Sequence, residues 1–309
     1  MAITGVLRPG HVQMRVLDLD ESVKFYRDVV GLVETGRDKQ GRVYFKTWDE
    51  RDHNSFIIRQ ADKAGLDFYG FKVDSVKTLD KLEADLRAYG LKTERMPAGD
   101  LLETGVRVRF EIPTGHLIEL YADKKDFGNC QEYLNPEAWT PEAEHGIAPI
   151  RMDHILLYGP NIEAAQKIFE EVLGFYLVEH VVLEDGKTDL AIWLSCSTKA
   201  HDIAFVRHPE PGKVHHIAFQ LDSWEKVLRA ADIMTMNRVQ IDIGPTRHGI
   251  TRGTTIYAFD PSGNRFETYC GGYSSYPDWK PIKWTMDEVG RGIFYHNRAL
   301  NDTFLSVVT

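Results

Sequence analysis

Residues 107–121, RVRFEIPTGHLIELY, and residues 255–269, TIYAFDPSGNRFETY, repeat one pattern at a distance of 148 positions. Each copy has an alternating apolar run, a turn that contains Pro-x-Gly, and a second run that carries one glutamate. The pattern predicts a β-hairpin that occurs once in each half of the chain. Because the fold is then used twice, a difference between the two copies cannot be explained by the fold alone.

The repeat extends upstream, to a strand and a helix in each half. Residues 11–16 and 154–158 are short alternating runs that begin with a histidine and are typical of strands. Residues 20–30 and 161–173 begin with Asp or Asn and stop at a glycine, so they predict two capped amphipathic helices.

A second strand and helix follow in each half. Residues 70–74 match residues 216–222, with an Asp-Ser pair at the end of each run. These pairs predict the N-terminal caps of helices at residues 76–89 and 224–236. Each half therefore contains two units of strand, helix and several strands.

These units predict an α+β fold of duplicated domains, each made of two βαβββ modules in a curved, mostly antiparallel sheet with helices outside. Residues 1–130 are the predicted N-terminal domain and residues 149–275 the C-terminal domain. Polar, aperiodic residues 131–148 are the predicted linker. Residues 276–309 have no counterpart and predict a C-terminal extension with a final helix that packs on the body or on a neighbouring subunit.

Composition narrows the class of protein. A chain of 309 residues suits two domains of about 150 residues. The formal charge of −9 argues against nucleic acid as a partner. Three cysteines without CxxC spacing favour a reducing compartment. Without a signal-peptide run or an 18-residue apolar stretch, we expect a soluble cytoplasmic protein with no membrane contact.

Three residues of the second half, His154, His216 and Glu267, stand on separate predicted strands. A lone strand histidine is usually a hydrogen-bonded core or surface residue, and a strand glutamate can be half of a buried ion pair. Together, two imidazoles and one carboxylate form the facial triad of non-haem Fe(II) sites, which leaves coordination positions open. The triad is therefore a candidate metal site.

The first half supplies the comparison. It keeps His11 and Glu119, but we assign Gly70 to the position of His216. Hairpin register adds a second difference, because a turn centred near residue 114 places Arg109 opposite Glu119. We therefore predict an Arg109–Glu119 contact that neutralises the carboxylate without a metal ion.

In the second half, a turn centred near residue 262 places Tyr257 opposite Glu267, so this carboxylate needs a cation from elsewhere. His201 and His248 lie in predicted loops of the same half. Loop histidines are commonly solvated, but with Tyr257 nearby they are candidates for an acid/base group. His215 is excluded, because a neighbour of His216 in a strand should point to the opposite face.

Nearly all of the chain resembles the type I extradiol ring-cleavage dioxygenases, specifically the catechol 2,3-dioxygenases of the vicinal-oxygen-chelate superfamily. The stretches that carry the resemblance are RPGHVQMRVLDLD, STKAHDIAF, VHHIAFQL and GPTRHGITRG-TTIYAFDPSGNRFETYCGG. The resemblance implies Fe(II) on His154, His216 and Glu267, and acid/base roles for His201, His248 and Tyr257. It also implies catechol or an alkylcatechol and O2 as substrates, a 2-hydroxymuconic semialdehyde-type product, a homotetramer and a metal-free N-terminal domain.

Several points stay open at this stage. The triad also suits Mn(II), and the substituent pattern of the catechol is not fixed. We expect Trp193, Ile250 and Phe266 to line the ring-binding pocket. Arg252 departs from the resemblance, since the related sequences usually carry histidine there. The same fold also serves glyoxalase-like isomerases, metal-dependent transferases and drug-binding proteins, so these remain alternatives.

Overall fold

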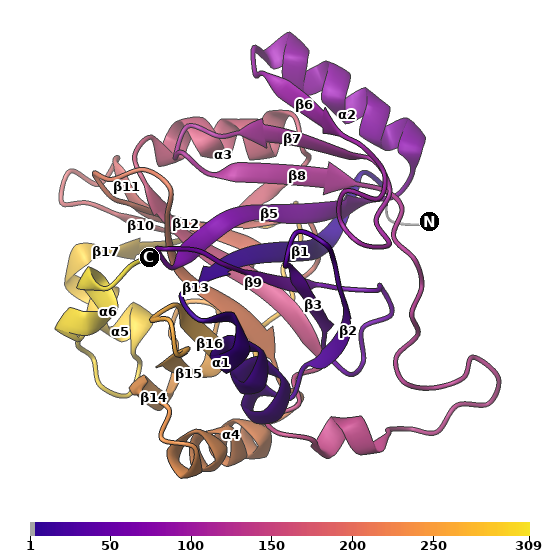
Figure 1. Ribbon diagram of the computed structural model, residues 1–309. Helices are drawn as coiled ribbons and strands as arrows, with labels where there is room; N and C mark the ends of the chain where they lie inside the picture. Colours follow the sequence, from indigo (N-terminus) through magenta and orange to yellow (C-terminus); the bar gives the residue numbers. More distant parts are fainter. Residues whose placement is uncertain (1–3) are drawn as a thin grey trace.

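The computed structural model describes residues 4–309, so the first three residues of the predicted N-terminal domain lie outside it. Two large sheets lie side by side in the centre of the molecule, and the longer helices cover their outer faces (Figure 1). This confirms the predicted α+β fold.

The first half forms an eight-stranded sheet. Its elements are β1 (Val6–Val16), α1 (Leu19–Lys24), a π-helix (Phe25–Val30), β2 (Val33–Arg37), β3 (Val43–Lys46), β4 (Phe56–Gln60), β5 (Gly65–Val73), α2 (Val76–Tyr89), β6 (Thr93–Met96), β7 (Arg107–Glu111) and β8 (Leu117–Tyr121).

The second half forms a nine-stranded sheet. Its elements, with the linker and the C-terminal segment, are a 3-10 turn (Pro141–Glu144), β9 (Arg151–Gly159), α3 (Ile162–Glu171), β10 (Tyr176–Val182), β11 (Asp189–Ser195), β12 (Ile203–Arg207), β13 (Lys213–Gln220), α4 (Trp224–Met236), β14 (Ile241–Arg247), β15 (Gly253–Phe259), β16 (Arg265–Gly271), β17 (Ile282–Thr285), a second 3-10 turn (Met286–Glu288), α5 (Val289–Ile293) and α6 (Asp302–Ser306).

Strand order reveals four βαβββ modules. The first sheet has the order β2-β3-β4-β1-β5-β8-β7-β6, and the second has β14-β15-β16-β13-β9-β12-β11-β10-β17. In every module the first strand pairs with the last in parallel, and the two first strands of a sheet pair antiparallel. The module starts therefore meet at the centre of each sheet, where β9, β13 and β16 bring the second-half histidines and Glu267 together.

Two helix predictions agree with the structure at both ends. Helices α2 and α4 span residues 76–89 and 224–236, and the hydroxyls of Ser75 and Ser223 cap them. The first helix of the chain differs, because it starts at Leu19 behind the cap of Asp18 and continues as a π-helix up to Gly31. Its counterpart α3 ends at Glu171, two residues before the predicted end.

The two halves share one hydrophobic core. Phe56 of the first sheet packs against Phe219 of the second, with ring centroids 5.5 Å apart, and Phe71 packs against Phe169. The linker runs away from this body and carries only a short 3-10 turn (Figure 1). None of the helices within residues 4–309 is long and apolar enough to cross a membrane.

The C-terminal extension packs on the body of its own chain. Strand β17 adds to the edge of the second sheet beside β10. The predicted final helix is a single short helix, α6, whose Phe304 packs on Tyr257 with ring centroids 5.0 Å apart. The extension therefore reaches the candidate site, which the sequence did not indicate.

Candidate metal centre and substrate pocket

Three strands bring the predicted triad to one point. One ligand atom each from His154, His216 and Glu267 lies within 4.8 Å of the others, and all three side chains are buried. The Oε2 atom of Glu267 is 3.0 Å from Nε2 of His154 and 3.3 Å from Nε2 of His216. The triad therefore faces inward as a compact set of two nitrogens and one oxygen.

A β-bulge precedes each of the two histidines. In the β9–β13 pairing, Asp153 and His215 are the extra residues that have no partner across the ladder. A bulge turns two successive side chains toward one side. The expectation that His215 points away from the site is therefore wrong, and its Nδ1 lies 2.6 Å from Nδ1 of His216.

The contacts behind His216 determine its tautomer. The carbonyl of Phe304 can only accept, so Nε2 of His215, 2.7 Å away, donates to it. Burial, and after it the charge of Arg265, hold the pKa of His215 well below its usual value, so the ring is neutral and its Nδ1 accepts. Nδ1 of His216 must then be the donor. Its Nε2 keeps a lone pair that points toward Glu267.

His154 is also held from behind, by a carboxylate. Its Nδ1 lies 2.9 Å from Oδ2 of Asp153, and this carboxylate can only accept. Burial would raise the pKa of Asp153, but Lys199 and then His154 hold that pKa well below its usual range. Burial would lower the pKa of His154, but the hydrogen bonds with Asp153 and Glu267 outweigh it and raise that pKa. Nε2 of His154 therefore either carries a proton toward Glu267 or gives its lone pair to a metal ion.

Two imidazole Nε2 atoms and a carboxylate oxygen thus converge, and among the described residues no lysine or arginine lies between them. Within residues 4–309, the ion pairs of Glu267 involve only imidazoles, those of His154, His216 and His248. Burial would raise the pKa of Glu267, but hydrogen bonding, first with His154, holds that pKa well below its usual value, so the carboxylate is charged. Such a donor set repels itself unless a proton or a metal ion lies inside it, so the residues fit a divalent metal ion.

The three predicted acid/base residues surround the triad. The ring of His201 lies 3.9 Å from the ring of His154 between centroids. Tyr257 pairs with Glu267 across the hairpin as predicted, and its hydroxyl lies 2.9 Å from Nε2 of His248. Nδ1 of His248 donates to the carbonyl of Ile293, so Nε2 is the acceptor for the hydroxyl of Tyr257.

Next to the triad lies a cavity of about 240 Å³. Two of the three predicted lining residues, Trp193 and Ile250, border it. The prediction for Phe266 is wrong, because a residue adjacent to Glu267 in a strand points to the other face, where Phe266 packs on Phe25. Much of the outer wall is apolar and comes from strands β10 to β12 and the C-terminal segment, including Val181, Leu190, Val206, Met286, Val289, Ile293 and Leu305.

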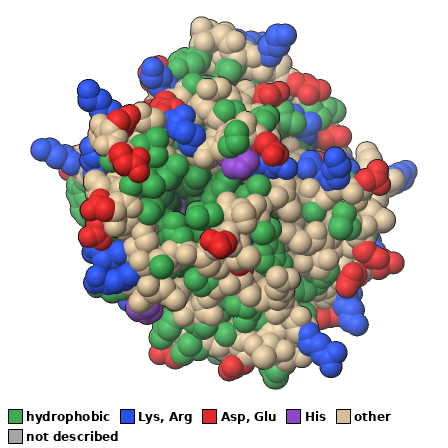
Figure 2. Space-filling model, turned by 90° about the vertical axis from the view of Figure 1, so that its left-hand side faces the viewer, with side chains coloured by type: hydrophobic (Ala, Val, Ile, Leu, Met, Phe, Trp, Pro, Cys, Tyr) green, Lys and Arg blue, Asp and Glu red, His purple; other side chains and the backbone are tan. Residues whose placement is uncertain are grey.

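Figure 2 shows the side of the molecule that carries the C-terminal segment, where hydrophobic side chains gather around a hollow. The sequence could not assign this wall, because residues 276–309 have no counterpart in the first half. The hydrogen bonds of Gly249 and Ile250 to the carbonyl of Gly292, both 2.8 Å, join the segment to the loop of His248. The extension therefore encloses the pocket and supports an acid/base candidate.

The corresponding place in the first half is filled by cations. Arg109 pairs with Glu119 across the hairpin as predicted, at 2.6 Å from Nη2 to Oε1. Arg107, which the sequence argument missed, is fully buried with Nε 2.9 Å from Oε2, and His11 adds a third contact at 2.9 Å. Burial would raise the pKa of Glu119, but these partners lower it to about 2.

The assignment of Gly70 to the position of His216 is wrong. Gly70 pairs with His11 in the first sheet, as Ala218 pairs with His154 in the second. The correct register is set by the two Asp-Ser pairs, which are 148 positions apart. A β-carbon at Gly70 would also collide with the ring of His11.

Phe68 is the true counterpart of His216. Its ring lies 5.7 Å from the ring of His11 and 4.8 Å below the guanidinium of Arg109. A benzene ring cannot bind a metal ion, so the first half lacks one ligand and holds two arginines at its carboxylate. The conclusion that this half lost its triad stands, on a different residue.

Arg252, the departure noted in the sequence, lies outside the cavity. Its backbone is left-handed at φ 60°, and its guanidinium stacks 4.7 Å over the ring of Tyr273. The neighbouring Thr251 does border the cavity, and its amide donates to the carboxylate of Glu179 at 2.7 Å. The loop is thus held without a contact from Arg252 to the triad.

Paired βαβββ modules with a buried two-histidine, one-carboxylate centre beside an apolar cavity define a site of the vicinal-oxygen-chelate class. The family described as "Catechol 2,3-dioxygenase-like N-terminal domain" matches residues 66–125. The family described as "Glyoxalase/Bleomycin resistance protein/Dioxygenase superfamily" matches residues 151–268. These matches cover nearly all of the second module and most of the second half.

Known relatives cover the whole chain. A metapyrocatechase from Pseudomonas sp. (strain CF600) is 54% identical over 99% of both chains. A manganese-dependent 2,3-dihydroxybiphenyl 1,2-dioxygenase from Geobacillus genomosp. 3 is 31% identical and covers 93% of this chain and 92% of its own. The solved 2,3-dioxygenase LapB from Pseudomonas sp. KL28 superimposes with a TM-score of 0.92 at 68% identity, over 93% of this chain and 99% of its own.

The protein therefore belongs to the catechol 2,3-dioxygenases, which are type I extradiol ring-cleavage dioxygenases. It is an enzyme, and its fold is that of the vicinal-oxygen-chelate superfamily.

Proposed function

We propose that the protein cleaves catechol or an alkylcatechol with O2 next to its two hydroxyls, and releases a 2-hydroxymuconic semialdehyde-type product. The observation that carries this proposal is the convergence of His154, His216 and Glu267 at the floor of an apolar cavity. The 54% identity to a metapyrocatechase supports it. No contact among the described site residues favours the alternative functions, those of glyoxalase-like or drug-binding proteins of this fold.

We propose Fe(II) as the resident metal, held by Nε2 of His154, Nε2 of His216 and a carboxylate oxygen of Glu267. The bound metal would supply two chelation positions for the catechol oxygens and one for dioxygen, and would acidify the catechol. One relative carries manganese dependence in its name, so metal analysis after expression in iron-supplemented and manganese-supplemented medium tests this choice.

The residues around the triad supply proton transfer. Nε2 of His248 accepts the hydroxyl proton of Tyr257 in a 2.9 Å hydrogen bond, so this pair can take a proton from a catechol hydroxyl placed beside Tyr257. Burial, and then the neighbouring charge of His154, hold the pKa of His201 well below its usual value, so its ring starts neutral. We propose that His201 holds and then returns a proton on the side of the cavity where the O–O bond breaks.

Charge in the cavity wall points to the kind of ring that fits. Within residues 4–309, the side chains that border the cavity include no lysine or arginine. A carboxylate on the ring would therefore be desolvated there without a cationic partner, at a cost of several kcal/mol. We expect catechol and its alkyl derivatives to be turned over much faster than 3,4-dihydroxyphenylacetate.

We further propose the division into a metal-free domain at residues 1–130 and a catalytic domain at residues 149–275, and a homotetramer in solution. Tyr133, Leu134 and Trp139 of the linker are 62%, 78% and 58% exposed, and such apolar side chains are often covered by a neighbouring subunit. Sedimentation of the intact protein tests the tetramer. The three cysteines are all unpaired, which supports a cytoplasmic location.

The central test is anaerobic reconstitution of the metal-free protein with Fe(II), followed by catechol in air. A yellow ring-opened product with one O2 consumed per catechol is the expected result. A cis,cis-muconate product would sink the proposal, because it arises from cleavage between the hydroxyls. Metal-free protein and protein loaded with Zn(II) are the controls.

A further inference from the structure

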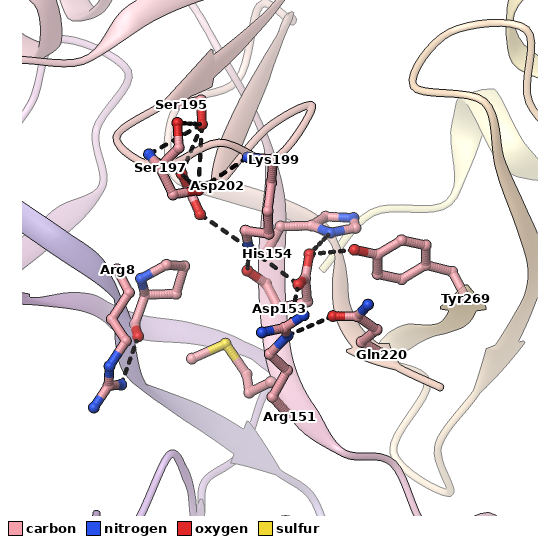
Figure 3. Close-up of polar contacts among 12 residues, drawn as sticks. Arg8, Arg151, Asp153, His154, Ser195, Ser197, Lys199, Asp202, Gln220 and Tyr269 are labelled. Atoms are coloured by element: carbon pink, nitrogen blue, oxygen red, sulfur yellow. Dashed lines mark hydrogen bonds and ion pairs between the residues drawn. The ribbon is translucent and has the colours of Figure 1, made fainter. Parts of the chain in front are cut away.

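The ammonium group of Lys199 lies between two buried carboxylates behind the candidate centre (Figure 3). Nζ is 3.0 Å from Oδ1 of Asp153, 2.9 Å from Oδ1 of Asp202 and 2.7 Å from the carbonyl of Asp153. Within residues 4–309, the other cation near either Oδ1 atom is the half-exposed Arg151, whose Nε is 3.5 Å from Oδ1 of Asp153. Lys199 is therefore the main counter-charge for both carboxylates.

The first carboxylate orients a candidate ligand. Oδ2 of Asp153 accepts from Nδ1 of His154 at 2.9 Å and from the hydroxyl of Tyr269 at 2.6 Å (Figure 3). A carboxylate behind a ligating histidine fixes its ring orientation and makes it a better donor to the metal. The position of His154 thus depends on Asp153, and the charge of Asp153 depends on Lys199.

The second carboxylate shapes the turn before His201. Oδ2 of Asp202 accepts from the amides of Cys196 and Ser197, at 2.9 and 3.1 Å, and from the hydroxyls of Ser195 and Ser197, both at 2.9 Å (Figure 3). These bonds close the turn that carries His201 to the rim of the cavity. One cation therefore contacts the supports of both His154 and His201.

The first half keeps the bulge but lacks the carboxylate. There, Gly10 is the unpaired bulge residue before His11, in the place of Asp153. A side chain at Gly10 would collide with the hydroxyl of Tyr121, which occupies the space of the missing carboxylate. The bulge thus occurs in both halves, whereas an aspartate at this bulge position, Asp153, occurs only in the half that has the triad.

The lysine is also absent from the first half. Ile203 pairs with β9 as Phe56 pairs with β1, and counting back four residues from each equates Lys199 with Asp52. Asp52 is anionic and forms an ion pair with Lys72 at 2.7 Å. At these positions the first half therefore has Gly10 and Asp52 in place of Asp153 and Lys199, so the pairing of Lys199 with Asp153 has no counterpart there.

We propose that Lys199 is a positioning residue that couples the candidate ligand His154 to the acid/base residue His201 through Asp153 and Asp202. The inference rests on the proposed function, because it assigns consequences for metal binding and turnover. Loss of the ammonium removes the ion pair of Asp202 and leaves Asp153 with only the more distant, half-exposed Arg151, so both supports shift. We expect about 10–100-fold weaker metal binding, as for other partners behind a ligand, together with a lower kcat.

The experiment compares Lys199→Met with Lys72→Met, a matched control in which a similarly buried lysine loses its carboxylate partner in the half without the triad. Three quantities are measured for each: the dissociation constant of the metal-free protein for Mn(II) by EPR, kcat and KM for catechol at saturating Fe(II), and Tm. K199M should weaken Mn(II) binding and lower kcat with little change in KM. K72M should lower Tm alone.

Two aspartate variants test separately the contact from Lys199 to His154 through Asp153 and the contact from Lys199 to His201 through Asp202. Asp153→Asn should weaken Mn(II) binding, whereas Asp202→Asn should lower kcat while Mn(II) binding stays within about threefold of wild type. Lys199→Arg keeps the charge and should recover most of the metal affinity. If K199M does not fold, the double variant Lys199→Gln/Asp202→Asn carries the same test, because it removes one cation and one anion together.

A K199M protein that binds Mn(II) and turns over as wild type does, with only Tm reduced, overturns the proposal. So does equal loss of metal affinity in K72M. Measurements on the wild-type protein separate this outcome from a failure of the proposed function. If wild type binds metal but does not cleave catechol, the proposed function is wrong, and the effect of K199M on Mn(II) binding can still be measured.

Discussion

Glu119 and Glu267 occupy the same place in two copies of one hairpin and have opposite surroundings. Glu119 is held by Arg107, Arg109 and His11 at 2.6–2.9 Å. Within residues 4–309, Glu267 forms ion pairs with imidazoles alone, accepts a hydrogen bond from the hydroxyl of Thr255, and lies opposite a tyrosine in the hairpin. The same backbone therefore carries either a neutralised carboxylate or one that requires a cation.

The difference teaches which features belong to the fold and which to the chemistry. Both sheets keep the bulges at the start of each module, at Gly10 and Asp67 in the first and at Asp153 and His215 in the second. At these bulges the backbone is kept and the side chains change. A metal site in this fold thus depends on a few residues placed on a scaffold that folds without them.

Replacing His216 with Phe tests the comparison most strongly, because it copies the first-half residue Phe68 into the second half. The variant loses one ligand and leaves Nδ1 of His215 without its donor. We expect activity to fall by more than the roughly 100-fold that follows from disturbing a partner behind a ligand. Metal content by mass spectrometry and oxygen uptake with catechol measure the effect.

The converse variant, Phe68→His, is the control. It should gain no metal, because the two arginines still hold Glu119. Stoichiometric metal in the first half of F68H would contradict the view that these guanidiniums exclude it.

His201 separates metal binding from catalysis. Asn54 stands at the corresponding position of the first half, by the count that equates Phe56 with Ile203. His201→Asn should leave metal content unchanged and slow turnover by about 10²–10⁴-fold, the range for loss of a general acid or base. Single-turnover kinetics with oxygen check this, and full activity in H201N would remove the assigned role.

Glu119→Gln should affect stability and leave catalysis intact. It removes the carboxylate partner of Arg109 and one of the two carboxylate partners of the fully buried Arg107, which keeps Asp100. Breaking a buried pair costs about 3–5 kcal/mol. Urea unfolding gives the loss, and kcat per bound metal should match wild type. A large fall in kcat per metal would mean that the first half takes part in catalysis.

Local sequence patterns predicted much of this molecule. Serine caps marked the starts of helices α2 and α4, and the Pro-x-Gly turns fixed both hairpin registers. The residues opposite the two glutamates followed from these registers. The triad followed as well, because the repeat made it stand out against its copy.

The errors came from places where the alternation of a strand is broken or no copy exists. The bulges invalidated the expected direction of His215, and the wrong register substituted Gly70 for Phe68. The C-terminal wall of the pocket could not be predicted, because residues 276–309 have no repeat and their position depends on long-range contacts such as β17 with β10.

Acid sensitivity gives the smallest expected effect in this comparison. The pKa of Glu119 is lowered from 4.5 to about 2 in the folded protein, where burial opposes the shift but His11 and the two arginines outweigh it. A carboxyl group whose pKa is lowered in the folded protein stabilises the fold at pH values above its pKa in the unfolded chain. This stabilisation is lost as the pH falls, here between about 4.5 and 2. The contribution is about 3 kcal/mol.

The free energy of unfolding, measured by denaturant titration at pH 5 and at pH 3, should therefore differ less between the two pH values in E119Q than in wild type, because glutamine cannot titrate. Equal pH dependence in the two proteins would mean that other groups dominate acid unfolding. The ion pairs of Glu119 with the two arginines would then not contribute the expected stability.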